Sequence, residues 1–474
     1  MIAEPAAIRS EPSAVEHFSI EPIPIKLKTV RWPDLFLLVS NFLINPSTIL
    51  IGGLAVVSGL SFWSTIVTCT IGILVVFVGY IVMATVGVDY GLTGQVTCRM
   101  VFGIRGAKWL PSTMRTLAST YWFAVQTVIA ASVIAAVLRQ TTGRQYSLVW
   151  IGLSLAATQV ILALFGYSWL KMLSRFGMPI KLGGIVYLFW LLMHVKANSY
   201  RPSSVFQFHA RSGWNYALCA VWFGNIVAAW LTMITDAADF CRYTRSRTDM
   251  WWGTMLAAFL ATAFSVSLGA YGAAASLGRE ANPFSLAAEV DPHWRTLLIL
   301  LVVIALDETT INVLNVYTGG LSLSNVFERL GRFWNTLLVG IVSTVLAGFP
   351  VLLTRLVPFT TMLGNLFAPL AGVLIAHYVF IERMQVDVAA LYDPAGRYSY
   401  WHGVNRSAMV WCVLGFGFYY VLPVSALPPL LTPLFTGGGY LLTERLQTHA
   451  KLSFRIKCRS LQRFSGRLWC KRPE

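Results

Sequence analysis

Charged residues are scarce in this chain of 474 residues. They make up 12% of it, whereas a soluble domain carries roughly 25%. Hydrophobic residues make up 56% and fall in long runs broken by short polar joints. Many runs reach about 18 residues or more, the length at which an apolar segment can cross a bilayer as a helix. The composition therefore excludes a soluble enzyme, a nucleic-acid-binding module and a disordered chain.

Motifs for several kinds of chemistry are also missing from the sequence. The seven cysteines form no C-x-x-C pair and the seven histidines form no H-x-x-x-H pair, so no metal site is indicated. No Gly-rich phosphate-binding motif of the P-loop type is present, so nothing indicates ATP-driven transport. We expect no cofactor.

The apolar runs predict an all-α integral membrane protein with about twelve transmembrane helices. The last two predicted spans are short. The predicted spans are Leu35–Leu60, Ser64–Val86, Thr113–Leu138, Leu148–Trp169, Met178–Val195, Tyr216–Ile234, Trp251–Leu277, Leu297–Tyr317, Phe333–Leu353, Thr361–Ile381, Ala408–Leu422 and Leu427–Leu442.

The basic residues are distributed unevenly between the two sides of this topology. If both termini lie on one side, that side holds about 28 of the 36 Lys and Arg residues. Cytoplasmic loops are enriched in Lys and Arg, so we predict a plasma-membrane protein with both termini in the cytoplasm. The net charge of +16 then marks orientation and lipid contact rather than a nucleic-acid partner.

The segments outside the spans divide the chain into three parts. Residues 1–30 contain four prolines and no long apolar run, and predict a mobile cytoplasmic tail. Residues 31–443 form the predicted transporter domain. Residues 444–474 are basic with interleaved apolar positions, which predicts an amphipathic helix on anionic lipid; a partner-binding tail is the alternative.

Polar residues inside the predicted spans are the main functional signal, because a polar group in hydrocarbon is costly without a partner. In the first span, Pro46 removes a helical hydrogen bond and pushes Asn45 out of helical geometry. The carbonyl groups freed there could line a cavity or bind a cation. An ordinary proline kink is the alternative.

Two spans carry tryptophans suited to a flat ligand. Trp122 and Gln126 are four residues apart in the third span and so share one helix face. An indole ring beside an amide can stack on a flat heterocycle and read its edge, and Trp230 of the sixth span could close the sandwich. We interpret Asp236 and Asp239, which follow Trp230, as a solvated helix end paired with nearby arginines.

The eighth span contains two adjacent acids, Asp307 and Glu308, the least expected feature of the chain. Glu308, Asn312 and Asn315 fall within about 40° of one another and form a polar stripe. Asp307 and Glu308 point about 100° apart, so we expect one of them at most to face the same site.

Taken together, these residues resemble the nucleobase:cation symporter-1 family, which transports purines, pyrimidines, hydantoins and allantoin. The resemblance runs from the first span to the loop after the tenth. Its most specific stretches are Cys98–Thr127 and Ala368–Asn405, supported by Thr235–Tyr243 and Asn315–Phe327.

The resemblance implies a LeuT-like fold with broken first and sixth helices. Spans one to five and six to ten would be inverted repeats, over about residues 31–195 and 214–382. Peripheral helices would follow at about 407–443.

The resemblance also implies a substrate site. Trp122 and Gln126 match the family's substrate-facing pair, Trp230 matches its stacking tryptophan, and Asn315 matches its substrate-binding asparagine. In sodium-coupled relatives a pair of hydroxyl residues in the eighth span binds the ion. The same spacing here implies a cation site with backbone or hydroxyl oxygens from Thr309, Thr310, Leu306, Phe42 and Asn45.

Two roles remain open for Glu308. It could accept hydrogen bonds from a nucleobase, or it could carry a proton through each cycle, as could Asp307. The predicted function is symport of a nucleobase-like heterocycle with H⁺ or Na⁺. The alternatives are an amino-acid permease of the LeuT fold and a membrane-embedded enzyme that uses Asp307 and Glu308.

Overall fold

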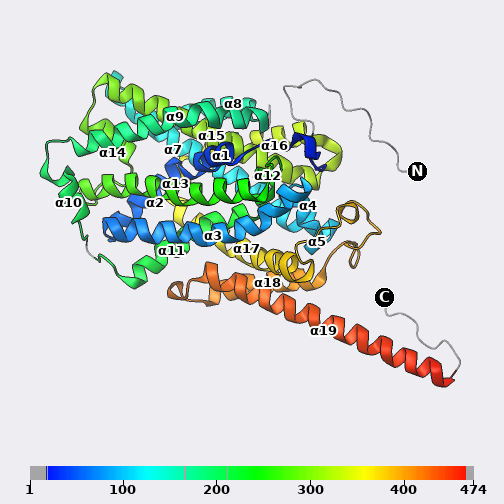
Figure 1. Cartoon of the computed structure of the whole chain (residues 1–474). Coiled ribbons are helices and arrows are strands. Elements are labelled where there is room, and N and C mark those ends of the chain that lie inside the picture. Colours follow the sequence, from blue (N-terminus) through cyan, green and yellow to red (C-terminus); the bar gives the residue numbers. More distant parts are fainter. Residues whose placement is uncertain (1–17, 19, 165–166, 211, 466–474) are drawn as a thin grey trace.

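The computed structural model describes residue 18 and residues 20–164, 167–210 and 212–465. Its regular structure in these ranges is helical (Figure 1). The longer helices are α1 (Trp32–Leu43), α2 (Pro46–Val57), α3 (Phe62–Tyr90), α7 (Thr113–Thr142), α8 (Leu148–Ala163), α9 (Tyr167–Met193), α11 (Tyr216–Trp230), α13 (Arg247–Ala275), α15 (Trp294–Val326), α16 (Gly331–Ala347), α17 (Leu356–Ala376), α18 (Arg406–Val421) and α19 (Pro428–Ser465).

Shorter helices and single turns fill the connections between these. They are η1 (Ile25–Leu27), α4 (Gly94–Thr97), α5 (Arg99–Phe102), α6 (Ile104–Ala107), η2 (Lys108–Ser112), η3 (Asn198–Tyr200), α10 (Pro202–Phe206), η4 (Leu231–Thr235), α12 (Ala237–Cys241), α14 (Pro283–Val290), η5 (Glu328–Leu330), η6 (Pro350–Arg355), η7 (His377–Ile381), η8 (Ala389–Leu391) and η9 (Val424–Ala426).

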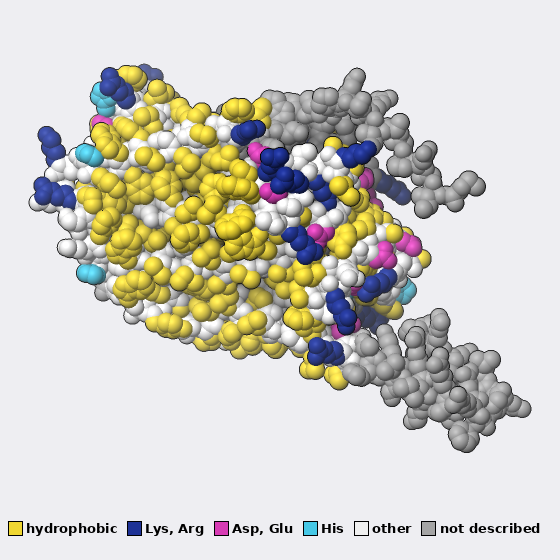
Figure 2. Space-filling model, viewed as in Figure 1, with side chains coloured by type: hydrophobic (Ala, Val, Ile, Leu, Met, Phe, Trp, Pro, Cys, Tyr) yellow, Lys and Arg dark blue, Asp and Glu magenta, His cyan; other side chains and the backbone are white. Residues whose placement is uncertain are grey.

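Each of the twelve predicted spans overlaps a helix. The predicted spans Leu148–Trp169 and Phe333–Leu353 extend past the ends of α8 at Ala163 and α16 at Ala347, and residues 165–166 lie outside the described residues. Within the described ranges, eight helices are long and apolar enough to cross a membrane, and the bent pair α1 and α2 makes a ninth. The remaining three predicted spans correspond to α8, α18 and α19. Figure 2 shows a broad band of hydrophobic side chains across the bundle, with Lys and Arg gathered toward its ends. This band is the surface that a bilayer would cover.

The first span is broken, as predicted from Pro46. Helices α1 and α2 meet at an angle of 51°. Asn45 joins the two ends: its side-chain nitrogen donates to the carbonyl of Phe42 at 2.7 Å, and its side-chain oxygen accepts from the backbone N–H of Thr48 at 2.9 Å. One side chain therefore caps both half-helices, and Pro46 occupies the first turn of α2, where its missing N–H costs nothing.

The sixth span is also broken. Helix α11 ends at Trp230, the chain continues as the 3-10 turn η4, and α12 begins after Asp236. Trp230 is therefore the last residue of regular α-helix before the break.

Helix packing brings the two broken spans next to long continuous helices. Helix α13 lies against α1, α2 and α3, and α15 lies against α7, α9 and α16. The approach of α13 to α2 requires glycine, because a Cβ at Gly269 would lie 1.8 Å from the carbonyl oxygen of Ile49. Helices α18 and α19 pack on α17 at the edge of the bundle (Figure 1).

The structure differs from the predicted tails in two respects. Residues 1–17 lie outside the described residues, but the end of the predicted tail of residues 1–30 is packed: Ile23 and Val30 are buried, and Ile23 donates its N–H to Gly91. At the other end, α19 runs without interruption through the predicted boundary at residue 444 to Ser465. Residues 466–474 lie outside the described residues.

Candidate substrate site and its two ion pairs

A cavity lies where the two broken spans face the third and eighth spans. The four residues predicted to contact substrate, Trp122, Gln126, Trp230 and Asn315, all line it. They come from α7, α11 and α15. The other residues of its wall are Phe42, Asn45, Ser47, Thr48, Ile51, Arg115, Ala229, Thr232, Met233, Ile311 and Leu314.

Aromatic rings hold the two tryptophans of the cavity. Trp122 makes an edge-on contact with Phe359, with ring centroids 5.6 Å apart, and Trp230 lies 6.0 Å from Phe42. Both indoles are only partly buried. Each ring is thus supported on one side and open toward the cavity, the arrangement that stacking on a flat ligand needs.

The two amides of the cavity supply hydrogen-bonding groups. Gln126 is buried, and its side-chain oxygen has no hydrogen-bond partner within the described part of the chain. Asn315 donates to the side-chain oxygen of Asn312 at 3.2 Å. A buried acceptor without a partner is costly, so a ligand N–H that bonds to Gln126 gains more than it would at a solvated site.

Glu308 lies deeper than its predicted role in substrate contact requires. The described residues of the cavity wall do not include it. Its carboxyl group accepts from Asn312 at 3.4 Å, and Asn312 also donates to Thr127 and Gln159, both at 2.9 Å. The predicted polar stripe of the eighth span therefore exists as a hydrogen-bonded chain, but Asn312 stands between Glu308 and Asn315.

A lysine side chain reaches the oxygens at the first-span break, next to the region of the predicted cation site. The Nζ atom of Lys181, on α9, lies 3.0 Å from the carbonyl oxygen of Asn41 and 2.7 Å from that of Ile44, at the end of α1. It also lies 2.7 Å from the side-chain oxygen of Asn41 and 2.9 Å from Oδ1 of Asp307. Lys181 and Asp307 are fully buried.

The four oxygens bonded to Nζ come from none of the five residues predicted to bind the cation, and the role of those five stays a prediction. The carbonyls used at the break are those of Asn41 and Ile44, whereas the Phe42 carbonyl accepts from Asn45. Thr310 is buried beside the ammonium group and donates to Asn41 and to the backbone of Asp307. Two further members of the predicted set, Leu306 and Thr309, are partly exposed.

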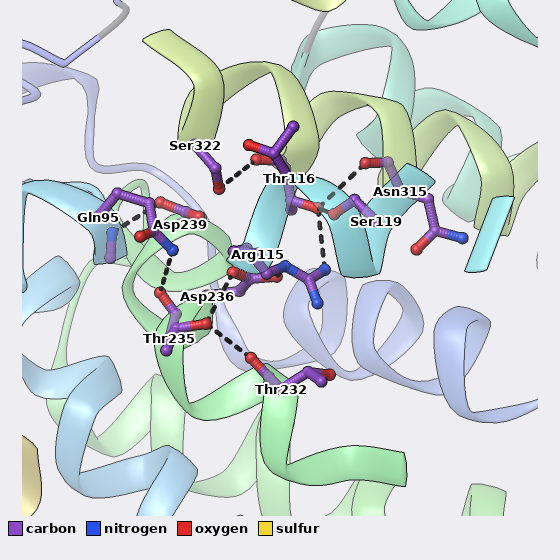
Figure 3. A network of polar contacts seen from close by, with 12 residues as sticks. Gln95, Arg115, Thr116, Ser119, Thr232, Thr235, Asp236, Asp239, Asn315 and Ser322 are labelled. Carbon is purple, nitrogen blue, oxygen red and sulfur yellow. Dashed lines mark hydrogen bonds and ion pairs between the residues drawn. The ribbon is translucent and has the colours of Figure 1, made fainter. Parts of the chain in front are cut away.

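A second buried ion pair stands at the break of the sixth span. Nε of Arg115, on α7, lies 2.5 Å from Oδ2 of Asp236 (Figure 3). Arg115 also donates to Thr318 of α15 at 3.1 Å. Asp239 is likewise fully buried and accepts from the N–H of Gly94 at 2.8 Å. The interpretation of Asp236 and Asp239 as a solvated helix end is therefore wrong, because both face the protein interior.

Lys181 and Arg115 are the buried cations beside the two breaks that the sequence prediction missed. Both count among the 28 basic residues predicted on the side of the termini. A signal was present for Lys181: a buried acid such as Asp307 needs a cationic partner, and Lys181 stands in an apolar stretch of the fifth span.

Comparison with known proteins identifies relatives of the chain. A family model described as a permease for cytosine/purines, uracil, thiamine and allantoin matches residues 22–441. The purine-uracil permease NCS1 of Arabidopsis thaliana is 24% identical over 422 residues, which cover 84% of this chain and 69% of that protein. The cytosine permease of Escherichia coli O157:H7 is 30% identical over 317 residues, which cover 66% of this chain and 68% of that protein.

A solved structure shares the fold. Mhp1, a nucleobase-cation-symport-1 family transporter in a closed conformation with bromovinylhydantoin bound, aligns with a TM-score of 0.75 at 21% identity, covering 91% of this chain and 94% of that one. The helical bundle with its broken first and sixth spans is thus a LeuT-like membrane transporter and not an enzyme. The family match over residues 22–441 makes the assignment specific: the chain belongs to the family of cytosine/purine, uracil, thiamine and allantoin permeases.

Proposed function

We propose that the protein takes up a nucleobase or a related flat nitrogen heterocycle of the purine, cytosine, uracil, allantoin or hydantoin type. The observation that supports this is the meeting of two indole rings and two amides, Trp122, Trp230, Gln126 and Asn315, in one cavity. Stacking fits a planar ring of any heterocycle, and the amides can read the pattern of donors and acceptors on its edge.

In the proposed mechanism the substrate binds between the two breaks and the transporter alternates its access. The half-helices at each break can change angle without disrupting a continuous hydrogen-bond ladder, which favours movement there. The Arg115–Asp236 pair, which ties α7 to the sixth break, would have to separate or shift if the sixth span moves against α7. A coupled cation, H⁺ or Na⁺, supplies the driving force.

Several further assignments belong to this proposal. The proposed substrate contacts are Trp122, Gln126, Trp230 and Asn315, with Glu308 acting through Asn312. The inverted repeats cover about residues 31–195 and 214–382. The protein lies in the plasma membrane with both termini in the cytoplasm, and the basic segment after residue 444 contacts anionic lipid. The charge distribution along the sequence supports this orientation, as do the Lys and Arg side chains at the end of the bundle from which α19 projects (Figure 2).

An amino-acid permease is the second candidate, because the fold also occurs in MhsT, whose structure in complex with L-phenylalanine aligns with a TM-score of 0.56. A panel of purines, pyrimidines, allantoin, hydantoins and amino acids, tested by thermal shift on the detergent-solubilised protein, separates the two. A ligand that binds the folded state alone raises the melting temperature. We expect a heterocycle to do so, and stabilisation by amino acids alone would refute the proposal.

A further inference from the structure

The environment of Lys181 is that of a bound cation rather than of an ordinary buried lysine. Four oxygens surround Nζ at 2.7–3.0 Å: two backbone carbonyls, the amide oxygen of Asn41 and Oδ1 of Asp307. An ammonium group has three N–H donors and no acceptor, so an all-oxygen shell suits it. A neutral amine would turn its lone pair toward one of these oxygens. We call this set of four oxygens the cation seat.

The cation seat links three helices that must be joined in one state of the transporter. Asn41 and Ile44 belong to the broken first span, Asp307 to α15, and Lys181 itself to α9. Thr310 completes the polar surroundings by donating to Asn41 at 3.1 Å. Hard metal cations bind carbonyl, amide and carboxylate oxygens of this kind, so these four oxygens suit either an ammonium group or such an ion.

We propose that Lys181 is the cation of this site: its ammonium group bridges the first-span break to α15 in place of a sodium ion, and its protonation couples the cycle to the proton gradient. This inference rests on the proposed function and specifies its coupling ion. In each cycle Nζ accepts one proton on the outer side. On the inner side one N–H bond breaks, the electron pair stays on the nitrogen, and the proton passes to water.

The charged groups around Lys181 fit this role. Within the described residues, the acids that act on Lys181 are Asp307 and Glu308, both on α15, while α1 presents uncharged oxygens. Loss of the proton would leave Asp307 without its cation and would remove the attraction between Nζ and the two carbonyls of the break. The deprotonated state therefore loosens the contact between α1 and α15 that the ammonium group holds.

Sodium binding, measured without any heterocycle, tests whether Lys181 fills the cation seat. Binding of radioactive ²²Na⁺ and the melting temperature in NaCl against choline chloride, at equal ionic strength, are measured on the full chain. We expect no saturable sodium binding and no sodium-specific shift for the wild type. Lys181→Ala leaves the oxygens without their cation, so it should bind sodium and gain about 3 °C or more in NaCl.

Two further variants complete the test. Lys196→Ala removes an exposed lysine that follows α9 and should behave as the wild type does. Lys181→Ser, which adds a hydroxyl oxygen to the emptied seat, serves if Lys181→Ala cannot be purified. Saturable sodium binding by the wild type, or its absence in both Lys181 variants, overturns the inference. Neither result depends on whether a nucleobase is transported, so the proposed function stands or falls separately in the ligand panel.

Discussion

The two broken spans are each held by a buried cation from a continuous helix, but in different ways. At the first break Lys181 bonds to backbone carbonyls of the break itself and to Asp307 on α15. At the sixth break Arg115 pairs with Asp236, a side chain of the break. Lysine can release its proton inside a protein, whereas arginine stays charged. On the proposal above, the cation at the first break titrates, whereas the cation at the sixth break keeps its charge throughout.

Removing one member of the Arg115–Asp236 pair should have the largest effect on stability. Arg115→Met leaves Asp236 buried without its cation and should cost about 3–5 kcal/mol of unfolding free energy. The double variant Arg115→Met/Asp236→Leu removes both charges and should recover most of that loss. Equilibrium unfolding in mixed micelles measures both. If the single variant were as stable as the wild type, the pair would not hold the sixth break.

Exchanging the two cations tests the difference between the breaks. Lys181→Arg keeps the positive charge but cannot release a proton, so accumulation of the bound heterocycle in vesicles should fall to the level of protein-free vesicles. Arg115→Lys should keep accumulation driven by the gradient, because that site needs only a charge. Uptake with an imposed proton gradient measures both variants. Active accumulation by Lys181→Arg would contradict a titrating role for the first break.

The two tryptophans of the cavity come from different kinds of span: Trp122 from the continuous helix α7 and Trp230 from the broken sixth span. Stacking contributes roughly 1–3 kcal/mol per base, so Trp122→Ala and Trp230→Ala should each weaken binding by about 5- to 140-fold. Isothermal titration with a heterocycle that binds the wild type gives the affinities. Trp150→Ala, at an exposed position of α8, is the control and should bind normally. An unchanged affinity for Trp122→Ala would remove α7 from the site.

Removing the helix cap at the first break should have the smallest effect on stability. Asn45→Ala deletes a side chain that caps both half-helices and should cost about 1 kcal/mol of stability. It should also weaken binding, since Asn45 lines the cavity. Asn215→Ala removes the matching cap at the exposed start of α11 and should leave binding unchanged. Equal binding losses in both variants would show that the effect is general helix destabilisation.

The fold and the cavity were predictable from the sequence because the signals for them lie in short stretches of neighbouring residues. Apolar runs and the Asn45–Pro46 break are properties of neighbouring residues, and the positions of Trp122, Gln126, Trp230 and Asn315 came from a resemblance to motifs of known order. The structure places those four side chains on one cavity, although their roles in binding stay predictions.

The ion pairs were missed because each joins residues far apart in the chain. Helix α9 begins at Tyr167, eleven residues before the predicted span start at Met178, so Lys181 lies about four turns inside it. Arg115 is likewise inside the apolar stretch Ile104–Thr142. A basic residue near an uncertain span boundary resembles a loop residue, and only its buried partner reveals otherwise.

The makeup of the cation seat has a consequence for how such transporters diverge. Two of its four oxygens are backbone atoms of Asn41 and Ile44, which every sequence with this break retains whatever its side chains. One substitution at position 181 would then be enough to replace the ammonium group of a lysine with a sodium ion from solution. Lineages of this fold could change the energy source of uptake in a single mutational step, without first rebuilding the site.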